Sequence, residues 1–192
     1  MDKFAALLLQ IKYKIGSIHY NPILSRTVIM STIKRYCVKN AAYFLTTNTK
    51  GRIEIFREPK NCDLLLITIE YFKRVLDCKV YGFCVMPDHC HLAIHPFGRY
   101  TFSYIMKMIK GSFARRLNKS RDTQGTIWQR KFYEVCILTN FDLINRLEYM
   151  HNNPVKAGLV KTPEQYPYSS YNHYIKNDYA QNPIISIDVP EL

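Results

Sequence analysis

A chain of 192 residues can build one hydrophobic core of ordinary size and is too short for two comfortable domains. Its hydrophobic content of 47% and charged content of 22% exclude a disordered protein. Lys and Arg number 27 against 15 Asp and Glu, and the formal charge of +12 favours nucleic acid as the partner. The sequence has no recognisable signal peptide or spanning segment, which predicts a cytoplasmic, nucleoid-associated protein without membrane contact.

The patterns typical of strands and helices are concentrated in the central part of the chain. We therefore predict one domain at residues 32–174, an N-terminal extension at residues 1–31 and a C-terminal tail at residues 175–192. The six cysteines contain no CxxC pair, so they are expected to be reduced and mostly buried.

Seven segments of the central domain have the patterns of regular elements. Aromatic and β-branched runs predict strands, and apolar residues three or four positions apart predict helices. In chain order we expect a strand at 42–48, a helix at 62–76, strands at 79–86 and 91–95, a helix at 100–119, a strand at 134–138 and a helix from 140 to about 151 that ends before Pro154. This order favours an α+β, ferredoxin-like fold, an antiparallel sheet with helices packed on one face.

The predicted helix at 100–119 is amphipathic and basic. Cations lie at many of its polar positions, and a further cation follows in the next loop: Lys107, Lys110, Arg115, Arg116, Lys119 and Arg130. These residues are candidate contacts to a nucleic-acid backbone. Charge runs also form ordinary solvated faces, so that alternative stays open.

His89 and His91 lie two residues apart where the third predicted strand begins. Side chains alternate between the faces of a strand, so both imidazoles lie on one face and can share a metal ion. His95 is in phase with them but lies about 13 Å from His91, too far to share the ion. A His-x-His pair alone is weak evidence, because imidazoles are also common as hydrogen-bonded residues at a sheet surface.

Tyr149 lies away from the apolar stripe of the last predicted helix. At about 100° per residue it is roughly 120° from the centre of that stripe, so it is not an obvious core residue. Asn153 would share its face if the helix continued, although a residue before proline is disfavoured in helices. A flank-packing aromatic and a helix-ending cap are the alternative interpretation.

Four segments together resemble the single-tyrosine HUH transposases of the IS200-like family. They are residues 86–92 (MPDHCHL), 127–133 (IWQRKFY), 149–158 (YMHNNPVKAG) and 166–171 (YPYSSY). The resemblance covers about residues 36–174 and is greatest to the branch of REP-associated tyrosine transposases.

This resemblance implies a role for each motif residue. His89 and His91 would bind a divalent ion with Asn153 as the third ligand, and Tyr149 would attack a DNA phosphate. The implied activity is cleavage and rejoining of single-stranded DNA through a 5′-phosphotyrosine, at hairpin or palindromic repeats, by a monomer or homodimer. We expect Mg²⁺ or Mn²⁺, although imidazole also suits zinc. Cys90 is expected to point to the other face of the sheet.

Two other classes of protein are alternatives to a transposase. A non-catalytic nucleic-acid-binding protein derived from a transposase would keep the charge and the fold, and a covalent DNA adduct would distinguish it. An RNA-binding ferredoxin-like module would require aromatic RNP motifs, which the sequence lacks.

Overall fold

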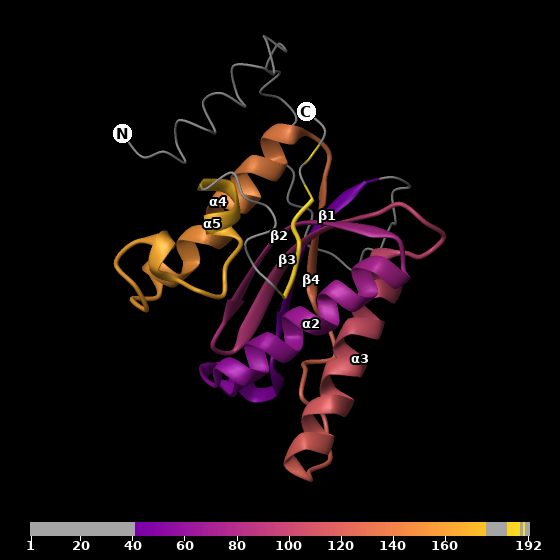
Figure 1. Ribbon diagram of the computed structural model, residues 1–192. Coiled ribbons are helices and arrows are strands. Elements are labelled where there is room, and N and C mark those ends of the chain that lie inside the picture. The colour runs from indigo at the N-terminus through magenta and orange to yellow at the C-terminus, as the bar shows by residue number, and fades with distance from the viewer. Residues whose placement is uncertain (1–40, 176–183, 189, 191–192) are drawn as a thin grey trace.

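The computed structural model describes residues 41–175, 184–188 and 190, and the centre of this part is an antiparallel sheet (Figure 1). The expected extension at residues 1–31 lies outside the described residues. The strands are β1 (Ala42–Asn48), β2 (Cys78–Met86), β3 (His89–Pro96) and β4 (Tyr133–Ile137). The helices are α2 (Pro59–Val75), α3 (Phe102–Arg121), α4 (Asn140–Lys156) and α5 (Tyr171–Ile175), with short 3-10 turns η2 (Lys50–Arg52), η3 (Ile55–Arg57) and η4 (Pro163–Gln165).

The order across the sheet is β2-β3-β1-β4, and every neighbouring pair is antiparallel. With α2 between β1 and β2 and α3 between β3 and β4, this is the ferredoxin-like arrangement. The α+β fold predicted from the sequence is therefore confirmed. The first strand has the predicted bounds, and the others begin and end close to them.

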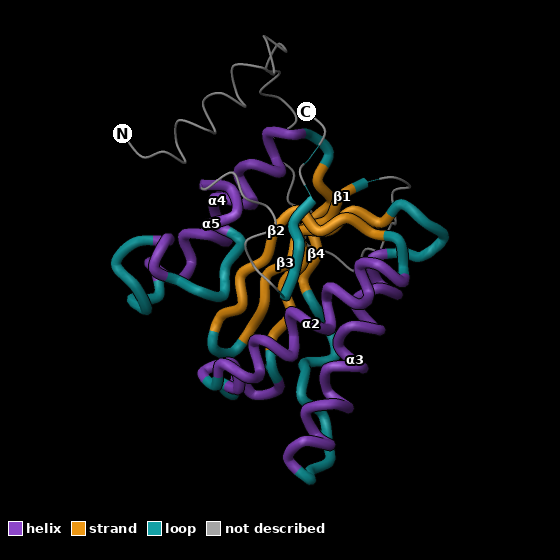
Figure 2. The backbone as a smooth tube through the Cα atoms, in the orientation of Figure 1, coloured by secondary structure: helices purple, strands orange, loops and turns teal. Residues whose placement is uncertain are grey.

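The two faces of the sheet carry different layers (Figure 2). Tyr43 stacks on Phe102 of α3 with ring centroids 4.1 Å apart, whereas Phe44 points the other way, with its ring 6.0 Å from that of Tyr149 on α4. Helices α2 and α3 form the expected layer on one face. Helix α4 lies against β2 and β3 on the opposite face, which the sequence did not predict.

The main core lies between the sheet and the α2–α3 layer. Phe113 of α3 is fully buried, with its ring centroid 5.5 Å from that of Phe56 and 5.3 Å from that of Trp128. The segment containing Trp128 joins the end of β1, because Gln129 N donates to Asn48 O at 2.9 Å. Burying each large apolar side chain contributes about 1.5–3 kcal/mol, so this cluster holds the 127–129 segment firmly below the end of β1.

The edge of β2 is covered by the YPYSSY segment. Val85 N donates to Tyr168 O at 2.8 Å, and Ser170 N donates to Phe83 O at 2.9 Å. The Ser170 hydroxyl also lies 2.8 Å from Nε2 of His151, a fully buried residue of α4. This motif therefore removes an exposed strand edge and attaches α4 to the sheet.

Residues 184–188, which the sequence assigned to a C-terminal tail, pack on the same edge. Ile185 and Ile187 are buried. Asp188 N donates to Val80 O at 2.9 Å, its carboxylate accepts from Val80 N at 2.7 Å, and Lys73 pairs with that carboxylate at 2.9 Å. This part of the predicted tail belongs to the folded body.

Helix α4 continues through Pro154 to Lys156, so the prediction that it ends before Pro154 is wrong. Proline removes one N–H donor, but here the loss falls in the last turn and its ring is buried. Hydrogen bonds of 2.9 Å resume at once, from Ala157 N to Asn153 O and from Leu159 N to Pro154 O. Asn153 consequently stays helical and shares a face with Tyr149.

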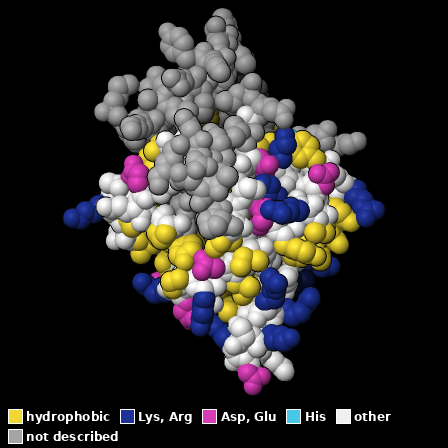
Figure 3. Space-filling model, viewed as in Figure 1, with side chains coloured by type: hydrophobic (Ala, Val, Ile, Leu, Met, Phe, Trp, Pro, Cys, Tyr) yellow, Lys and Arg dark blue, Asp and Glu magenta, His cyan; other side chains and the backbone are white. Residues whose placement is uncertain are grey.

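No helix in the described part of the chain is long and apolar enough to cross a membrane. Figure 3 shows Lys and Arg side chains scattered among apolar ones on the face that includes α2 and α3.

The close approach of α4 to β2 depends on Gly82. A Cβ at this position would lie 2.5 Å from Leu147 Cδ2 and 3.1 Å from both Met150 Cε and Ser170 Oγ. We expect Gly82→Val to destabilise the fold by about 1–3 kcal/mol through overpacking. The measurement is thermal unfolding, with a drop of roughly 2–4 °C per kcal/mol for a chain of this size.

Gly111→Ala is the matched control, because a Cβ there meets no atom within 4 Å. In the middle of α3 this change should be neutral or stabilise by about 0.5–1 kcal/mol. Equal melting temperatures for the two variants would show that α4 does not press on Gly82.

Candidate active site

An open cleft of about 660 Å³ lies on the face of the sheet that α4 only partly covers. The pairing of β1 with β3 sets Thr46 opposite His91 and Asn48 opposite His89, and all four line the cleft. Tyr149 and Asn153 of α4 form its other wall. The structure therefore brings together the four residues predicted as nucleophile and metal ligands.

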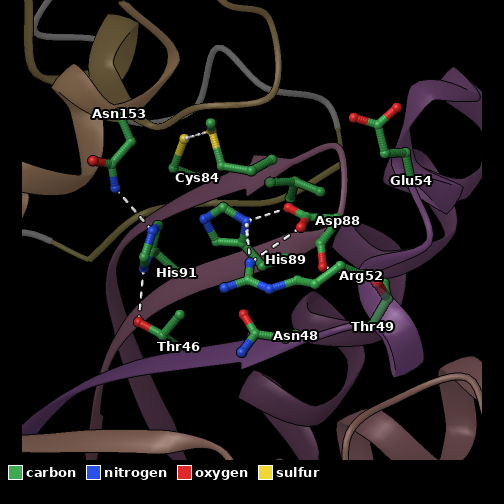
Figure 4. Close-up of polar contacts among 12 residues, drawn as sticks. Thr46, Asn48, Thr49, Arg52, Glu54, Cys84, Asp88, His89, His91 and Asn153 are labelled. Atoms are coloured by element: carbon green, nitrogen blue, oxygen red, sulfur yellow. Dashed lines mark hydrogen bonds and ion pairs between the residues drawn. The ribbon is translucent and has the colours of Figure 1, made fainter. Parts of the chain in front are cut away.

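His91 is almost completely buried, and both of its ring nitrogens have partners (Figure 4). Nδ1 lies 2.8 Å from Thr46 Oγ1, and Nε2 lies 2.8 Å from Asn153 Nδ2. Because an amide nitrogen can only donate, Nε2 must accept, and the single proton of the neutral ring is on Nδ1. Burial, helped by the nearby charges of His89 and Arg52, lowers the pKa of His91 to about 3. The ring is neutral at physiological pH.

His89 is oriented by the residue before it. Its Nδ1 lies 2.6 Å from Asp88 Oδ1, a distance typical of a charge-assisted hydrogen bond, so Nδ1 carries a proton and donates it to the carboxylate. Burial alone would raise the pKa of Asp88, but the hydrogen bond to His89 and the charges of His89 and Arg52 lower it below its ordinary value. Carboxylates that orient a ligand imidazole in this way are usual at metal sites.

The two imidazoles and the tyrosine form one cluster. The ring centroids of His89 and His91 are 4.8 Å apart, and that of Tyr149 is 5.8 Å from that of His91. Tyr149 is 45% exposed, so its hydroxyl is open to a ligand in the cleft. The Lys156 ammonium lies 5.3 Å from the centre of the Tyr149 ring and provides a nearby positive charge.

The donor set mixes imidazole nitrogens with amide oxygens, which is compatible with Mg²⁺ or Mn²⁺ once ligand oxygens complete it and equally with zinc. Among residues 41–175 and 184–188 no group of three or more His, Cys, Asp or Glu could hold a metal ion, so imidazole and amide atoms are the available donors. One of these is unsatisfied: Asn48 Oδ1 is buried and has no hydrogen-bond partner in the described structure. Two imidazoles with the amides of Asn153 and Asn48 leave positions for phosphate and water.

The cations predicted to contact DNA on α3 do not lie in this cleft. Lys107, Arg115 and Arg116 line a groove between α2 and α3, on the opposite face of the sheet. Lys110 donates to Gln129 O at 2.8 Å, and it lines a separate depression together with Arg130. Their role in DNA binding stays a prediction.

The cations that do line the cleft are Arg52, Arg146 and Lys156, and sequence reasoning missed them. Arg146 and Lys156 lie three residues before and seven residues after Tyr149, spacings that place all three on one face of α4. That periodicity was available in the sequence. Arg52 comes from η2, far away in the sequence, and only the fold reveals it.

Three further residues can be placed relative to the cleft. Cys90 is buried in the core on the α2 side, as predicted, where burial raises the pKa of its thiol. His95 lies outside the cleft with its Nδ1 2.9 Å from the Tyr81 hydroxyl, as expected for a residue with no part in the site. Tyr133, the last residue of the 127–133 motif, is 61% exposed and lines the cleft.

The fold and this cluster match a known class of protein. The sequence model of the family described as "Transposase IS200 like" matches residues 37–153, more than half of the chain. The chain therefore belongs to the IS200-like transposase family, and the resemblance found in its motifs is confirmed.

Within that class, the similar proteins include REP-associated tyrosine transposases. The chain is 29% identical over 180 residues to a Haemophilus influenzae protein provisionally given that name, an alignment of 82% of this chain and 98% of the relative. It is 28% identical over 144 residues to the REP-associated tyrosine transposase of Escherichia coli K12, covering 74% and 84%. A solved REP-associated tyrosine transposase, bound to a REP hairpin, superposes with a TM-score of 0.66 at 26% identity, covering 84% of this chain and 92% of that one.

Proposed function

We propose that this protein is a metal-dependent transposase that cleaves and rejoins single-stranded DNA, with Tyr149 as the nucleophile. The observation that carries the proposal is the cluster in the open cleft: two imidazoles oriented by Asp88, Thr46 and Asn153, beside the half-exposed tyrosine. This combination suits phosphoryl transfer, in which the charge on a phosphate oxygen must be neutralised while a nucleophile attacks in line.

In the proposed reaction, Tyr149 carries the 5′ end of the cleaved strand in a covalent bond. Its oxygen forms a bond to phosphorus as the bond from phosphorus to the 3′ oxygen breaks, leaving a 5′-phosphotyrosine and a 3′-hydroxyl. The phenol loses its proton, and the departing 3′ oxygen gains one. Attack by another 3′-hydroxyl reverses these steps and rejoins a strand, which an ordinary hydrolytic nuclease does not do.

His89, His91 and Asn153 would hold the metal ion, and Asp88 and Thr46 would fix the two imidazoles in the binding tautomer. The bound ion, Mg²⁺ or Mn²⁺, would polarise a non-bridging phosphate oxygen. Arg146 and Lys156 would contact the DNA backbone on either side of Tyr149.

Hairpin DNA is the proposed substrate, because the similar solved transposase is bound to a REP hairpin. The unpaired strand would enter the cleft, where the exposed ring of Tyr133 can stack on a base. The cytoplasmic, nucleoid-associated location and the choice between monomer and homodimer stay predictions. A non-catalytic DNA-binding protein derived from a transposase is the competing function, but the hydrogen-bonded arrangement of His89, His91 and Asn153 beside Tyr149 favours catalysis.

The first prediction concerns the nucleophile. Incubation with single-stranded hairpin DNA and Mg²⁺ or Mn²⁺ should give a covalent protein–DNA species that survives denaturing electrophoresis. Tyr149→Phe should abolish that species and leave DNA binding nearly intact, because only the attacking oxygen is lost. Tyr71→Phe, at an exposed tyrosine of α2, is the control and should retain the adduct. An adduct formed by the Tyr149→Phe variant would show that another group attacks.

The second prediction concerns the metal ligands. His89→Ala and His91→Ala should each weaken metal binding by more than the roughly 10–100-fold typical of losing an outer-shell partner. Cleavage should be lost with it. His95→Ala should bind the ion as the native protein does. Calorimetric titration of the three variants with Mn²⁺ is the measurement, and equal losses in all three would contradict a two-histidine site.

The third prediction separates the two groups of cations. In single-stranded DNA each phosphate contact contributes about 0.7 to the dependence of log affinity on log salt concentration. Replacing Arg146 and Lys156 with Gln in the Tyr149→Phe background should therefore flatten that dependence, measured by fluorescence anisotropy. An unchanged slope would place the strand outside the cleft.

The same assay tests the α3 cations. Arg115→Gln with Arg116→Gln should flatten the slope for the hairpin if, as the sequence predicts, α3 contacts DNA. An unchanged slope would contradict that prediction and leave the cleft as the DNA-binding surface.

A further inference from the structure

The turn that follows β1 holds an arginine in an unusual backbone conformation. Gly51 has a φ of 65° and Arg52 a φ of 57°, so two successive residues are left-handed. The other non-glycine residues with positive φ in the described part are Asp77 and Asp122, and aspartate tolerates this region better than arginine. An arginine here is strained, and strained residues persist where the surrounding structure fixes them.

The turn is fixed at both ends to the Pro87-Asp88 dipeptide that precedes His89. Thr49 N donates to Asp88 O at 2.9 Å, and Phe56 N donates to Pro87 O at 2.9 Å. The side chain of Arg52 is therefore carried on a rigid support that it shares with a candidate metal ligand.

The guanidinium of Arg52 points into the cleft beside the two imidazoles (Figure 4). Its Nη1 lies 3.1 Å from Asp88 Oδ2 and 3.5 Å from His89 Nδ1. The carboxylate of Asp88 thus contacts His89 with one oxygen and Arg52 with the other. No hydrogen bond or ion pair of Nε or Nη2 occurs within the part of the chain that the structure describes, and the side chain is 55% exposed.

We propose that Arg52 binds the phosphate that Tyr149 attacks. A guanidinium with one nitrogen anchored and two free donors can grip a phosphate in the forked geometry that lysine cannot provide. Asp88 then has two roles, since it orients the His89 ring and holds Arg52. The proposal rests on the proposed function and adds to it a phosphate-binding residue opposite the α4 wall of the cleft.

The test compares two strands and two proteins. The probe is the hairpin oligonucleotide that forms an adduct with the native protein, either unmodified or carrying one uncharged methylphosphonate at the mapped adduct phosphate. In the Tyr149→Phe background, Arg52→Gln should weaken binding of the unmodified strand about tenfold, the effect of losing one charge-assisted hydrogen bond. On the methylphosphonate strand it should have little effect. Equal losses on both strands would overturn the contact.

Two further measurements distinguish a direct contact between Arg52 and the phosphate from a role of Arg52 in positioning Asp88. Arg52→Gln should bind Mn²⁺ with an affinity within about threefold of the native protein, well below the loss expected when an outer-shell partner is removed. Arg52→Lys should recover only part of the DNA affinity, because the fork is lost. Arg52→Gln could instead lose metal affinity while its affinity for DNA, measured without metal, stays unchanged. That result would show that Arg52 only supports Asp88 and would overturn the proposal.

The backbone gives an independent check. Arg52→Gly should melt about 2–4 °C above Arg52→Gln, since glycine relieves the left-handed strain, and should still form adduct slowly. Lys50→Gln, an exposed neighbour outside the cleft, and Asp122→Gly, a left-handed position at the end of α3, are controls that should form adduct at the native rate. Full activity in Arg52→Gly would overturn the proposal.

Failure of the two proposals can be told apart. If the native protein forms no adduct, the proposed function is wrong and the assignment of Arg52 fails with it. If the native protein forms the adduct and Arg52→Gln does so equally well, only the assignment of Arg52 is wrong.

Discussion

The hydrogen bonds of His91 connect the three elements that build the cleft. Its Nδ1 meets Thr46 of β1, its Nε2 meets Asn153 of α4, and its own strand, β3, lies between them. An imidazole buried to this degree is costly to ionise, and leaving either nitrogen unpaired would cost about 1–3 kcal/mol. The position of α4 over the sheet, and with it the position of Tyr149, is therefore tied to the tautomer of one ring.

The two faces of the sheet have separate tasks. On one face, α2 and α3 bury aromatic and aliphatic side chains and enclose the main core. On the other face, α4 covers only part of the sheet, and the uncovered part carries the site residues. Gly82 permits the close approach of α4 there, and the YPYSSY segment fastens the helix by way of Ser170 and His151. This support below and beside the cleft holds the site residues in fixed positions.

The cleft is also positively charged. The cleft gathers Arg52, Arg146 and Lys156 around Tyr149, and none of the described residues that line it is acidic. The nearby carboxylate of Asp88 is paired with Arg52, so the field offered to a phosphate remains positive. Arg52 requires a left-handed backbone to reach this place, and the cost of that conformation is offset by the hydrogen bonds that fix the turn to Pro87 and Asp88.

The sequence alone determined the order of the elements, because strand and helix periodicities are local properties. It assigned roles to His89, His91 and Tyr149 only through the resemblance of their motifs to a known family, since a His-x-His pair and a tyrosine away from an apolar stripe are weak evidence when taken alone. The end of α4 was predicted wrongly, because burial of Pro154 and the bonds that follow it depend on tertiary packing. Only the fold decided that α3 and its cations lie on the far face from Tyr149, and that Arg52 joins the site. Which distant side chains meet depends on the crossing of layers and on a strained turn, and neither is encoded in the spacing of neighbouring residues.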